Sequence, residues 1–461
     1  MSLTAVVRGA WVLTMGPGAG LVRDGAVALG DDGAIHAVGP AEEILARHPD
    51  AEVAGSGDGI VMPGMVNAHT HLTECLIPGM GEDCLLWEWF ERVVGPCAHV
   101  TTREDMVVGT RLKAAEMLLS GITTVNDMSC HRNLGSHASL GAVDGLAEMG
   151  MRGVVSFGAE NEYPGAPAAD AFMDEHEALA DRCAGEPLVG FRAGVGTVLG
   201  VTDELFARTI AACAEHGWAV HTHLAEVREE LTESRTRWGM STIEHSARRG
   251  LLDHGVIAGH CIWCAEADIA LLASKHVAVA HNPVANMILA SGVCPVGRLR
   301  REGVPVGLGT DGAASNDNQD MFGVLKSAAL LQKVHALDPH ALLAPDVVRM
   351  ATIEGARALG LEREIGSLEP GKRADVVLLD GDTPELATIH DPFQQLVYCA
   401  TARCVSDVWV DGVRRVRDGR LEGAAVADLA RAARRQGADL VARAGLGAES
   451  VLAGPGRVAA T

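Results

Sequence analysis

Strand-like apolar runs that alternate with helix-like segments constrain the fold of this chain most strongly. The runs are short, polar residues cluster at their C-terminal ends, and longer segments such as 103–120 and 203–217 separate them. This alternation indicates parallel strands joined by helices, and the number of repeats favours a closed (β/α)8 TIM barrel over an open sheet. The runs are GITTVNDM (121–128), RGVVSFG (152–158), PLVGFRAGV (187–195), WAVHTHLAE (218–226), GVIAGHC (255–261), VAVAHNP (277–283) and VPVGLGTDG (304–312).

A different sequence texture flanks this region on both sides. Residues 1–60 consist of short β-rich runs and turns, and the same texture returns in 365–421, where Asp411-Gly412 marks a hairpin. We therefore expect an α/β protein with a barrel over 61–364 and a small composite β-sandwich domain built from both chain ends. The helical spacing within residues 422–461 predicts a C-terminal helical tail.

Composition and charge exclude several classes of partner. The chain has 38 basic and 60 acidic residues, a net charge of −22, which disfavours nucleic acid and anionic membranes. Neither a membrane span nor a secretory signal is evident. The cysteines, an odd number scattered from Cys75 to Cys404, indicate reduced thiols, so we expect a cytoplasmic protein. Cys261 and Cys264 have redox or zinc spacing, but no second pair complements them.

Polar residues gather at the ends of the apolar runs, where barrel enzymes place their chemistry. His69 and His71 are two residues apart, so strand alternation turns both toward one face, which suits two imidazole ligands of one cation. A single histidine in such a place is more often structural, but several at converging strand ends point to a site. The candidates are His69, His71, His223, Glu226, His260 and Asp311.

An ordered series of motifs carries a family resemblance. The motifs are VMPGMVNAHTHL, HTHLAE, GHC, AHNPVANMILASG, GLGTDGAASND and IGSLEPGKRADVVLLD. They resemble the amidohydrolase superfamily, specifically the deaminase and chlorohydrolase branch that includes methylthioadenosine/S-adenosylhomocysteine deaminases and s-triazine hydrolases. The resemblance implies a single divalent metal ion, because residues 187–200 lack the lysine that related two-metal enzymes use. The ion is expected to be Zn²⁺ in preference to Fe²⁺. Its implied ligands are His69, His71, His223 and Asp311.

The same resemblance implies a hydrolytic deamination and assigns roles in it. Hydroxide on the metal attacks a ring carbon of an amino-substituted nitrogen heterocycle, and ammonia leaves. Glu226 shuttles a proton to a ring nitrogen, Asp311 takes the proton of the water, and His260 orients the attacking oxygen. Trp89 and Ser315 are expected to border the substrate.

Three positions bear on the substrate. Nucleoside-specific members of the branch carry a carboxylate where this chain has Ala98, a Gly-Pro-His pattern at Gly194–Gly196, and an arginine at Phe157. Without these polar groups, the hydroxyls of a ribose would lack their usual partners. We therefore expect a compact aminated purine, pterin, pyrimidine or s-triazine.

Several alternatives and details stay open at this stage. The site could hydrolyse another leaving group, such as chloride or an alkylamine, or a cyclic amide, and a scaffold without catalysis is the remote alternative. The contributions of His221, Trp87 and Asn316 are undecided. We interpret 281–286 as structural and the acidic run 226–230 beyond Glu226 as a solvated helix face. A homodimer is expected only by analogy with such folds.

Overall fold

Eight parallel strands form the centre of the molecule, which we describe from a computed structural model covering residues 3–17, 20–81 and 83–447. Their spatial order is the chain order, and every neighbouring pair is parallel, as the alternation predicted. The last strand returns to the first, since the Asp311 N–H donates to the His69 carbonyl at 3.0 Å. The strands are β6 (Met65–Thr70), β7 (Ile122–Ser129), β8 (Arg152–Ala159), β9 (Val189–Thr197), β10 (Val220–Leu224), β11 (Ile257–His260), β12 (Ala278–His281) and β13 (Val306–Leu308).

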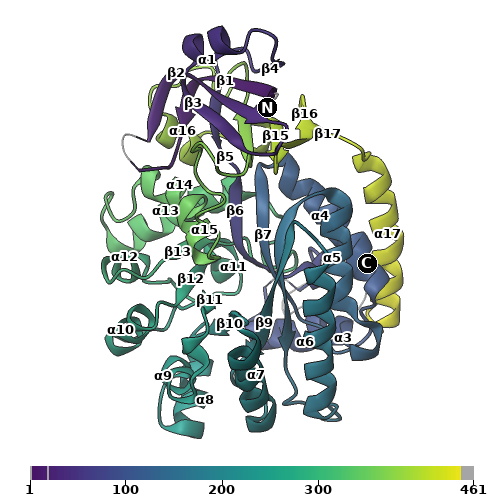
Figure 1. Ribbon diagram of the computed structural model, residues 1–461. Helices are drawn as coiled ribbons and strands as arrows, with labels where there is room; N and C mark the ends of the chain where they lie inside the picture. The colour runs from purple at the N-terminus through teal and green to yellow at the C-terminus, as the bar shows by residue number, and fades with distance from the viewer. Residues whose placement is uncertain (1–2, 18–19, 82, 448–461) are drawn as a thin grey trace, which may run out of the picture.

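Helices surround this barrel on its outside (Figure 1). They begin where capping chemistry favours it: Thr102 and Asp105 form a capping box at the first long helix, and Thr202 caps another. The main ones are α4 (Arg103–Leu119), α5 (Ala138–Met149), α6 (Ala169–Ala184), α7 (Asp203–His216), α8 (Arg228–Trp238), α9 (Thr242–Arg249), α10 (Glu266–Ser274), α12 (Val296–Arg301), α13 (Met321–Ala336), α14 (Ala344–Met350) and α15 (Ile353–Ala358). The architecture is the predicted (β/α)8 TIM barrel.

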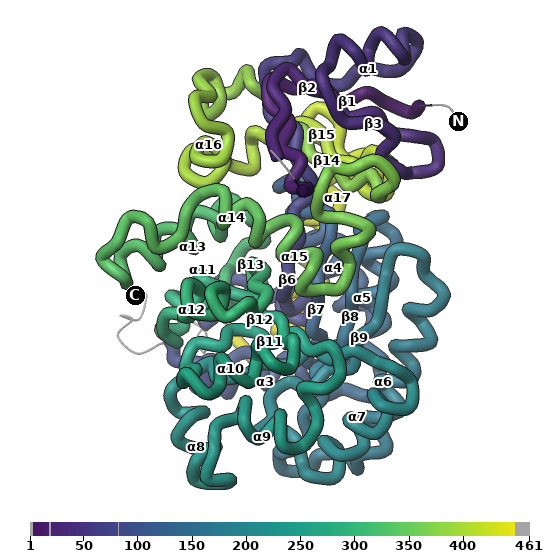
Figure 2. The backbone as a smooth tube through the Cα atoms, turned by 60° about the vertical axis from the view of Figure 1, so that its left-hand side comes forward, coloured from purple at the N-terminus to yellow at the C-terminus, as the bar shows by residue number. Residues whose placement is uncertain are grey.

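A second sheet joins the two ends of the chain above the barrel (Figures 1 and 2). It is a mixed sheet in which β5 pairs antiparallel with β14, so strands far apart in sequence share one domain, as expected. The hairpin predicted at Asp411-Gly412 joins β15 to β16. The strands are β1 (Leu3–Leu13), β2 (Leu21–Gly30), β3 (Ile35–Pro40), β4 (Val53–Ala54), β5 (Ile60–Pro63), β14 (Val376–Leu379), β15 (Val405–Val410), β16 (Val413–Arg417) and β17 (Arg420–Leu421).

Shorter helices and the tail complete the fold. Within the predicted tail, the structure has α17 (Val426–Arg443), which lies against α4 through an ion pair of Arg443 with Asp105 at 2.7 Å; residues 448–461 of that prediction lie outside the described residues. The cavity side carries α2 (Leu86–Trp89), a π-helical turn (Phe90–Val94) and α3 (Gly95–Ala98); elsewhere lie α1 (Ala41–Arg47), α11 (Pro283–Ile288) and α16 (Pro392–Tyr398). Within the described ranges, no helix is long and apolar enough to span a membrane. All the cysteines are free thiols.

Candidate metal centre and active site

Three imidazoles and one carboxylate converge at the carboxyl ends of the barrel strands. His69 lies on β6 and His71 just after it, while His223 lies on β10. The Nε2 atom of His223 is 3.2 Å from the Nε2 atoms of both other histidines. Asp311 Oδ1 lies 3.4 Å from His69 Nε2 and 3.5 Å from His71 Nε2. The four residues predicted as ligands thus present four donor atoms to one point.

The hydrogen bonds on the far side of each ring fix which nitrogen faces that point. The Nδ1–H of His71 donates to the Met128 carbonyl, and that of His223 donates to the Gly196 carbonyl, both at 2.7 Å. Each Nε2 therefore carries a lone pair, and these lone pairs face one another at 3.2 Å. Facing lone pairs repel each other unless a cation lies between the rings, so the residues fit a divalent metal ion.

The protonation states agree with this interpretation. Burial, together with the neighbouring His69, lowers the pKa of His71 to about 4, and burial lowers the pKa of His223 well below its ordinary value. Burial would raise the pKa of Asp311, but the charge of His260 and contact with His69 hold it well below the usual range. Neutral imidazoles with an ionised carboxylate are the states that bind a metal.

His221, whose contribution the sequence left open, lies behind the metal ligands. Its Nε2 accepts a hydrogen bond from His69 Nδ1 at 2.8 Å, and its Nδ1 is 3.0 Å from the Ser156 hydroxyl. Ser156 in turn donates to the Asp127 carbonyl at 2.7 Å. His221 therefore orients His69 and does not face the metal position.

Glu226 and His260 lie beside the cluster, as predicted. His260 Nε2 is 3.5 Å from Glu226 Oε2 and 3.7 Å from Asp311 Oδ2, and the His260 Nδ1–H donates to Asn286 Oδ1 at 2.8 Å. Burial raises the pKa of Glu226 to about 7. The segment around Asn286 that we interpreted as structural thus orients a residue of the site.

The acidic run after Glu226 is only in part the solvated face that we predicted: Arg228 and Glu229 are exposed, but Glu230 is not. Glu230 is only 6% exposed, and its carboxylate accepts the backbone N–H groups of Ala225 and Glu226 at 2.7 and 2.8 Å. It also accepts the Thr242 hydroxyl at 2.7 Å. The prediction of a solvated side chain was wrong for Glu230 because the turn after β10 folds back over the helix start. This fold brings the carboxylate of Glu230 to unpaired N–H groups.

A cavity of about 380 Å³ opens above the cluster. Trp89 and Ser315, the two predicted substrate neighbours, line it, and so does the 40% exposed Trp87. The Trp89 indole donates to the Ala314 carbonyl at 3.1 Å, which holds its ring against the wall. Asn316 is not among the lining residues; its amide donates to the Thr310 carbonyl at 2.7 Å.

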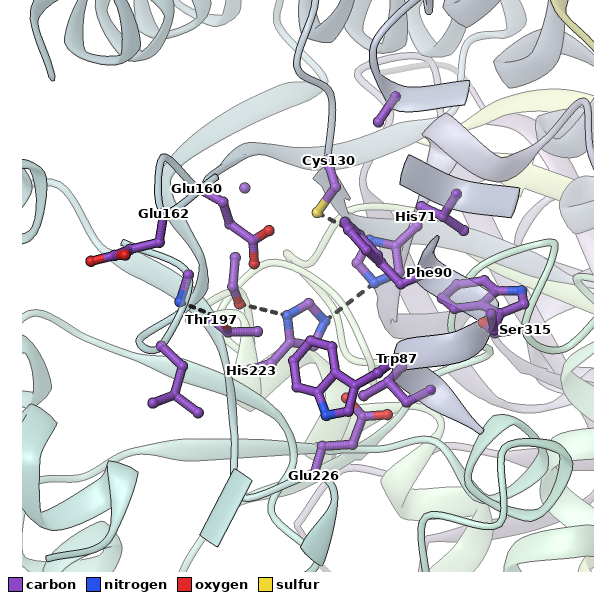
Figure 3. A pocket seen from close by; sticks show the side chains of 18 of the residues that line it. His71, Trp87, Phe90, Cys130, Glu160, Glu162, Thr197, His223, Glu226 and Ser315 are labelled. Atoms are coloured by element: carbon purple, nitrogen blue, oxygen red, sulfur yellow. Dashed lines mark hydrogen bonds between the residues drawn. The ribbon is translucent and has the colours of Figure 1, made fainter. Parts of the chain in front are cut away.

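Sequence reasoning missed the other end of this cavity. Figure 3 shows Glu160 and Glu162 across from His71 and Trp87. These carboxylates follow β8 in ENEY, a segment without a recognisable motif. The lining residues that our sequence analysis did not single out include Glu74, Phe90, Arg132, Glu160, Glu162, Tyr163, Glu233 and Arg237.

Comparison with known proteins places the chain in a family. The sequence model described as "Amidohydrolase family" matches residues 60–415, which include every candidate ligand. The chain belongs to the amidohydrolase family. As a family member with deaminase-named relatives it is a hydrolase that acts on carbon–nitrogen bonds, and its cluster of histidines and Asp311 could hold a divalent metal ion.

Individual relatives cover most of the chain. A 5-methylthioadenosine/S-adenosylhomocysteine deaminase of Moorella thermoacetica is 37% identical over 396 residues, 85% of this chain and 90% of the relative. A 5'-deoxyadenosine deaminase of Methanothermobacter thermautotrophicus is 38% identical over 376 residues, covering 81% and 86%. A solved structure described as an adenosine deaminase from Xanthomonas campestris with bound zinc has a TM-score of 0.88 and 32% identity, covering 95% and 98%.

Proposed function

We propose that this amidohydrolase is a zinc-dependent hydrolytic deaminase of a small amino-substituted nitrogen heterocycle. The observation that carries the proposal is Glu226: a buried carboxyl with a pKa of about 7, 3.5 Å from His260, beside three imidazoles and a carboxylate that fit a metal. A group that is half protonated near neutral pH is suited to give a proton to a ring nitrogen. The deaminase names of the relatives support the same reaction.

Zinc is preferred over iron because the solved relative from Xanthomonas campestris is described with bound zinc. When bound by His69, His71, His223 and Asp311, the ion supplies the Lewis acidity that lowers the pKa of water to roughly 7 and makes hydroxide available. The residues around it then handle the protons and the substrate.

Each proton has a residue that holds it. Asp311 takes the proton of the water through Oδ2, which lies 3.7 Å from His260, and His260 stabilises the attacking oxygen through Nε2. A C–O bond forms at the ring carbon while Glu226 protonates the adjacent ring nitrogen. The amino group then takes the proton that Asp311 holds, and its C–N bond breaks to release ammonia. The remaining proton of the added hydroxyl returns to Glu226, so the ring keeps a carbonyl.

The cavity supports a flat substrate that reaches beyond the metal. Trp89 offers an aromatic wall and Ser315 a hydroxyl beside Asp311. Ala98 and Gly196 line the cavity without any polar side-chain group, which favours an aminated base over a nucleoside held by these positions. Phe157 is fully buried and does not line the cavity. The expected homodimer stays a prediction.

The test measures ammonia release and bound metal together. Purified protein with zinc is assayed on adenine, guanine, cytosine, pterin and melamine, beside Glu226→Gln and its control Glu229→Gln, an exposed carboxylate on the next helix turn. We expect turnover to follow zinc content, Glu226→Gln to lose about 10²- to 10⁴-fold in kcat with its metal retained, and Glu229→Gln to match the parent protein.

Two results would contradict the proposal. Release of chloride or an alkylamine from substituted triazines, without ammonia from any amino substrate, would assign the alternative leaving groups. A full complement of zinc without turnover of any ring would point to the scaffold interpretation.

A further inference from the structure

The end of the cavity away from the metal contains a carboxylate that the proposed mechanism does not use. Glu160 directly follows β8 (Arg152–Ala159), and its side chain is 21% exposed. Figure 3 shows its carboxylate turned toward the cavity, beside Thr197. Burial raises the pKa of Glu160, although the charge of Arg132 and hydrogen bonding with Thr197 act in the opposite direction.

Two glycines make the space that Glu160 occupies. A Cβ atom at Gly196 would lie 2.6 Å from Glu160 Cγ and 2.7 Å from its Oε1, and one at Gly200 would lie 2.8 Å from Oε1. Neither glycine has a positive φ, so the backbone itself accepts a side chain at both positions. Any residue larger than glycine would therefore displace the carboxylate from its place in the cavity.

The backbone around Glu160 is fixed. The N–H groups of Asn161 and Glu162 both donate to the Gly200 carbonyl at 2.9 Å, and the Asn161 amide binds the Thr202 hydroxyl at 3.0 Å. The loop that carries the carboxylate is thus tied to the loop after β9 that carries Gly200. A ligand that meets Glu160 meets a preorganised group.

Arg132 balances the charge of Glu160 without a hydrogen bond to its carboxylate. Its guanidinium lies 4.2 Å from the ring centroid of Tyr163 and 5.0 Å from that of Phe90, between two aromatic walls. From there its Nη2 reaches Glu160 Oε2 only to 3.8 Å, beyond hydrogen-bond distance. The carboxylate therefore keeps acceptor capacity that Arg132 does not use, beside the hydrogen bonds that it makes with Thr197.

We propose that Glu160 determines specificity by accepting a hydrogen bond from an N–H or O–H group at the end of the substrate away from the reacting carbon. The inference rests on the proposed deaminase function and adds how the rest of the substrate is recognised. A donor of this kind comes either from the ring itself or from hydroxyls of an attached sugar. A substrate with only acceptors at that end would leave Glu160 desolvated without a partner.

Two matched pairs of probes separate the sources. Adenine has an N9–H that 9-methyladenine lacks, and adenosine has the sugar hydroxyls that 2′,3′-dideoxyadenosine lacks. Binding is measured by titration calorimetry on zinc-loaded full-length protein carrying Glu226→Gln, so that the probes are not consumed. The same background receives Glu160→Ala, Gly196→Ala or the control Glu177→Ala, which removes an exposed carboxylate of α6 that does not line the cavity.

In at least one pair, we expect the probe that has the donor to bind about tenfold or more tightly than the probe that lacks it. The reason is that the donor meets the partly desolvated carboxylate of Glu160. Glu160→Ala reduces that preference to about twofold or less, Gly196→Ala reduces it by displacing the carboxylate, and Glu177→Ala keeps it. A preference within the adenine pair assigns a ring N–H, and one within the adenosine pair assigns sugar hydroxyls.

Other outcomes overturn the inference. It fails if no probe binds, if neither pair shows a preference, or if the preference survives in a folded Glu160→Ala variant; should that variant melt early, Gly196→Ala decides. The proposed function fails separately: probes would bind with a Glu160-dependent preference while the enzyme with Glu226 intact releases no ammonia from any amino heterocycle.

Discussion

The two ends of the cavity hold their side chains in different ways. At the metal end, each of the three ligand imidazoles has a second hydrogen bond behind it, as in His71 to Met128 and His223 to Gly196. At the far end, Glu160 lies on a loop, 21% exposed, and depends on space left by two glycines. The barrel strands and the turns directly after them therefore hold the reacting groups, whereas a loop farther from the metal holds the group that we propose for recognition. Four predictions test this division.

The largest effect is expected from a ligand of the metal end. His71→Ala removes one of four converging donor atoms and leaves His223 Nε2 with a single imidazole neighbour at 3.2 Å. We expect zinc per chain, measured by elemental analysis, to fall from about one to below about 0.1, and deaminase activity to fall at least about 10³-fold. His340→Ala, on an 81% exposed side chain, is the control and should keep both. Full metal retention in His71→Ala would remove this histidine from the ligand set.

The next effect tests whether the support behind the ligands matters. His221→Phe keeps an aromatic ring in the barrel but removes the partner of His69 Nδ1. We expect zinc affinity, measured by competition with a chelating dye, to fall about 10- to 100-fold, while the fold stays intact by circular dichroism. Unchanged affinity would show that the ring of His69 needs no second hydrogen bond, and the contrast between the two cavity ends would weaken.

A smaller effect is expected at the turn that carries Glu226. Glu230→Gln leaves one amide oxygen where two carboxylate oxygens accept the N–H groups of Ala225 and Glu226. We expect kcat to fall about tenfold with zinc content unchanged, because a turn that has lost a hydrogen bond positions the proton donor less well. Loss of zinc in this variant would instead show that the turn supports the metal ligands themselves.

These residues also show how far the sequence could predict the molecule. Strand alternation and the His-x-His pair identified the barrel and the convergence of its ligands, because period and strand ends are local properties. Glu160 escaped notice because its environment depends on Gly196 and Gly200, which lie on a different strand and loop. Glu230 was misread because exposure depends on how a turn folds over a helix start. Contacts of this kind depend on tertiary packing, which spacing alone does not reveal.

The smallest expected effect tests whether Glu160, at the far end of the cavity, reduces the stability of the fold. The pKa of Glu160 is raised above its ordinary value in the folded protein, chiefly by burial, so the fold disfavours the charged form. The resulting penalty is absent below the unfolded pKa, grows as pH rises from the unfolded pKa to the folded pKa, and is fully present above the folded pKa. Glu160→Gln should therefore melt about 1–2 °C higher than the parent at pH 8 and equally at pH 4, whereas Glu162→Gln should show no such dependence. A lower Tm for Glu160→Gln at pH 8 would mean that Arg132 more than offsets the burial penalty of the charged carboxylate. The side chains at both ends of the cavity would then be stabilised by their own neighbours.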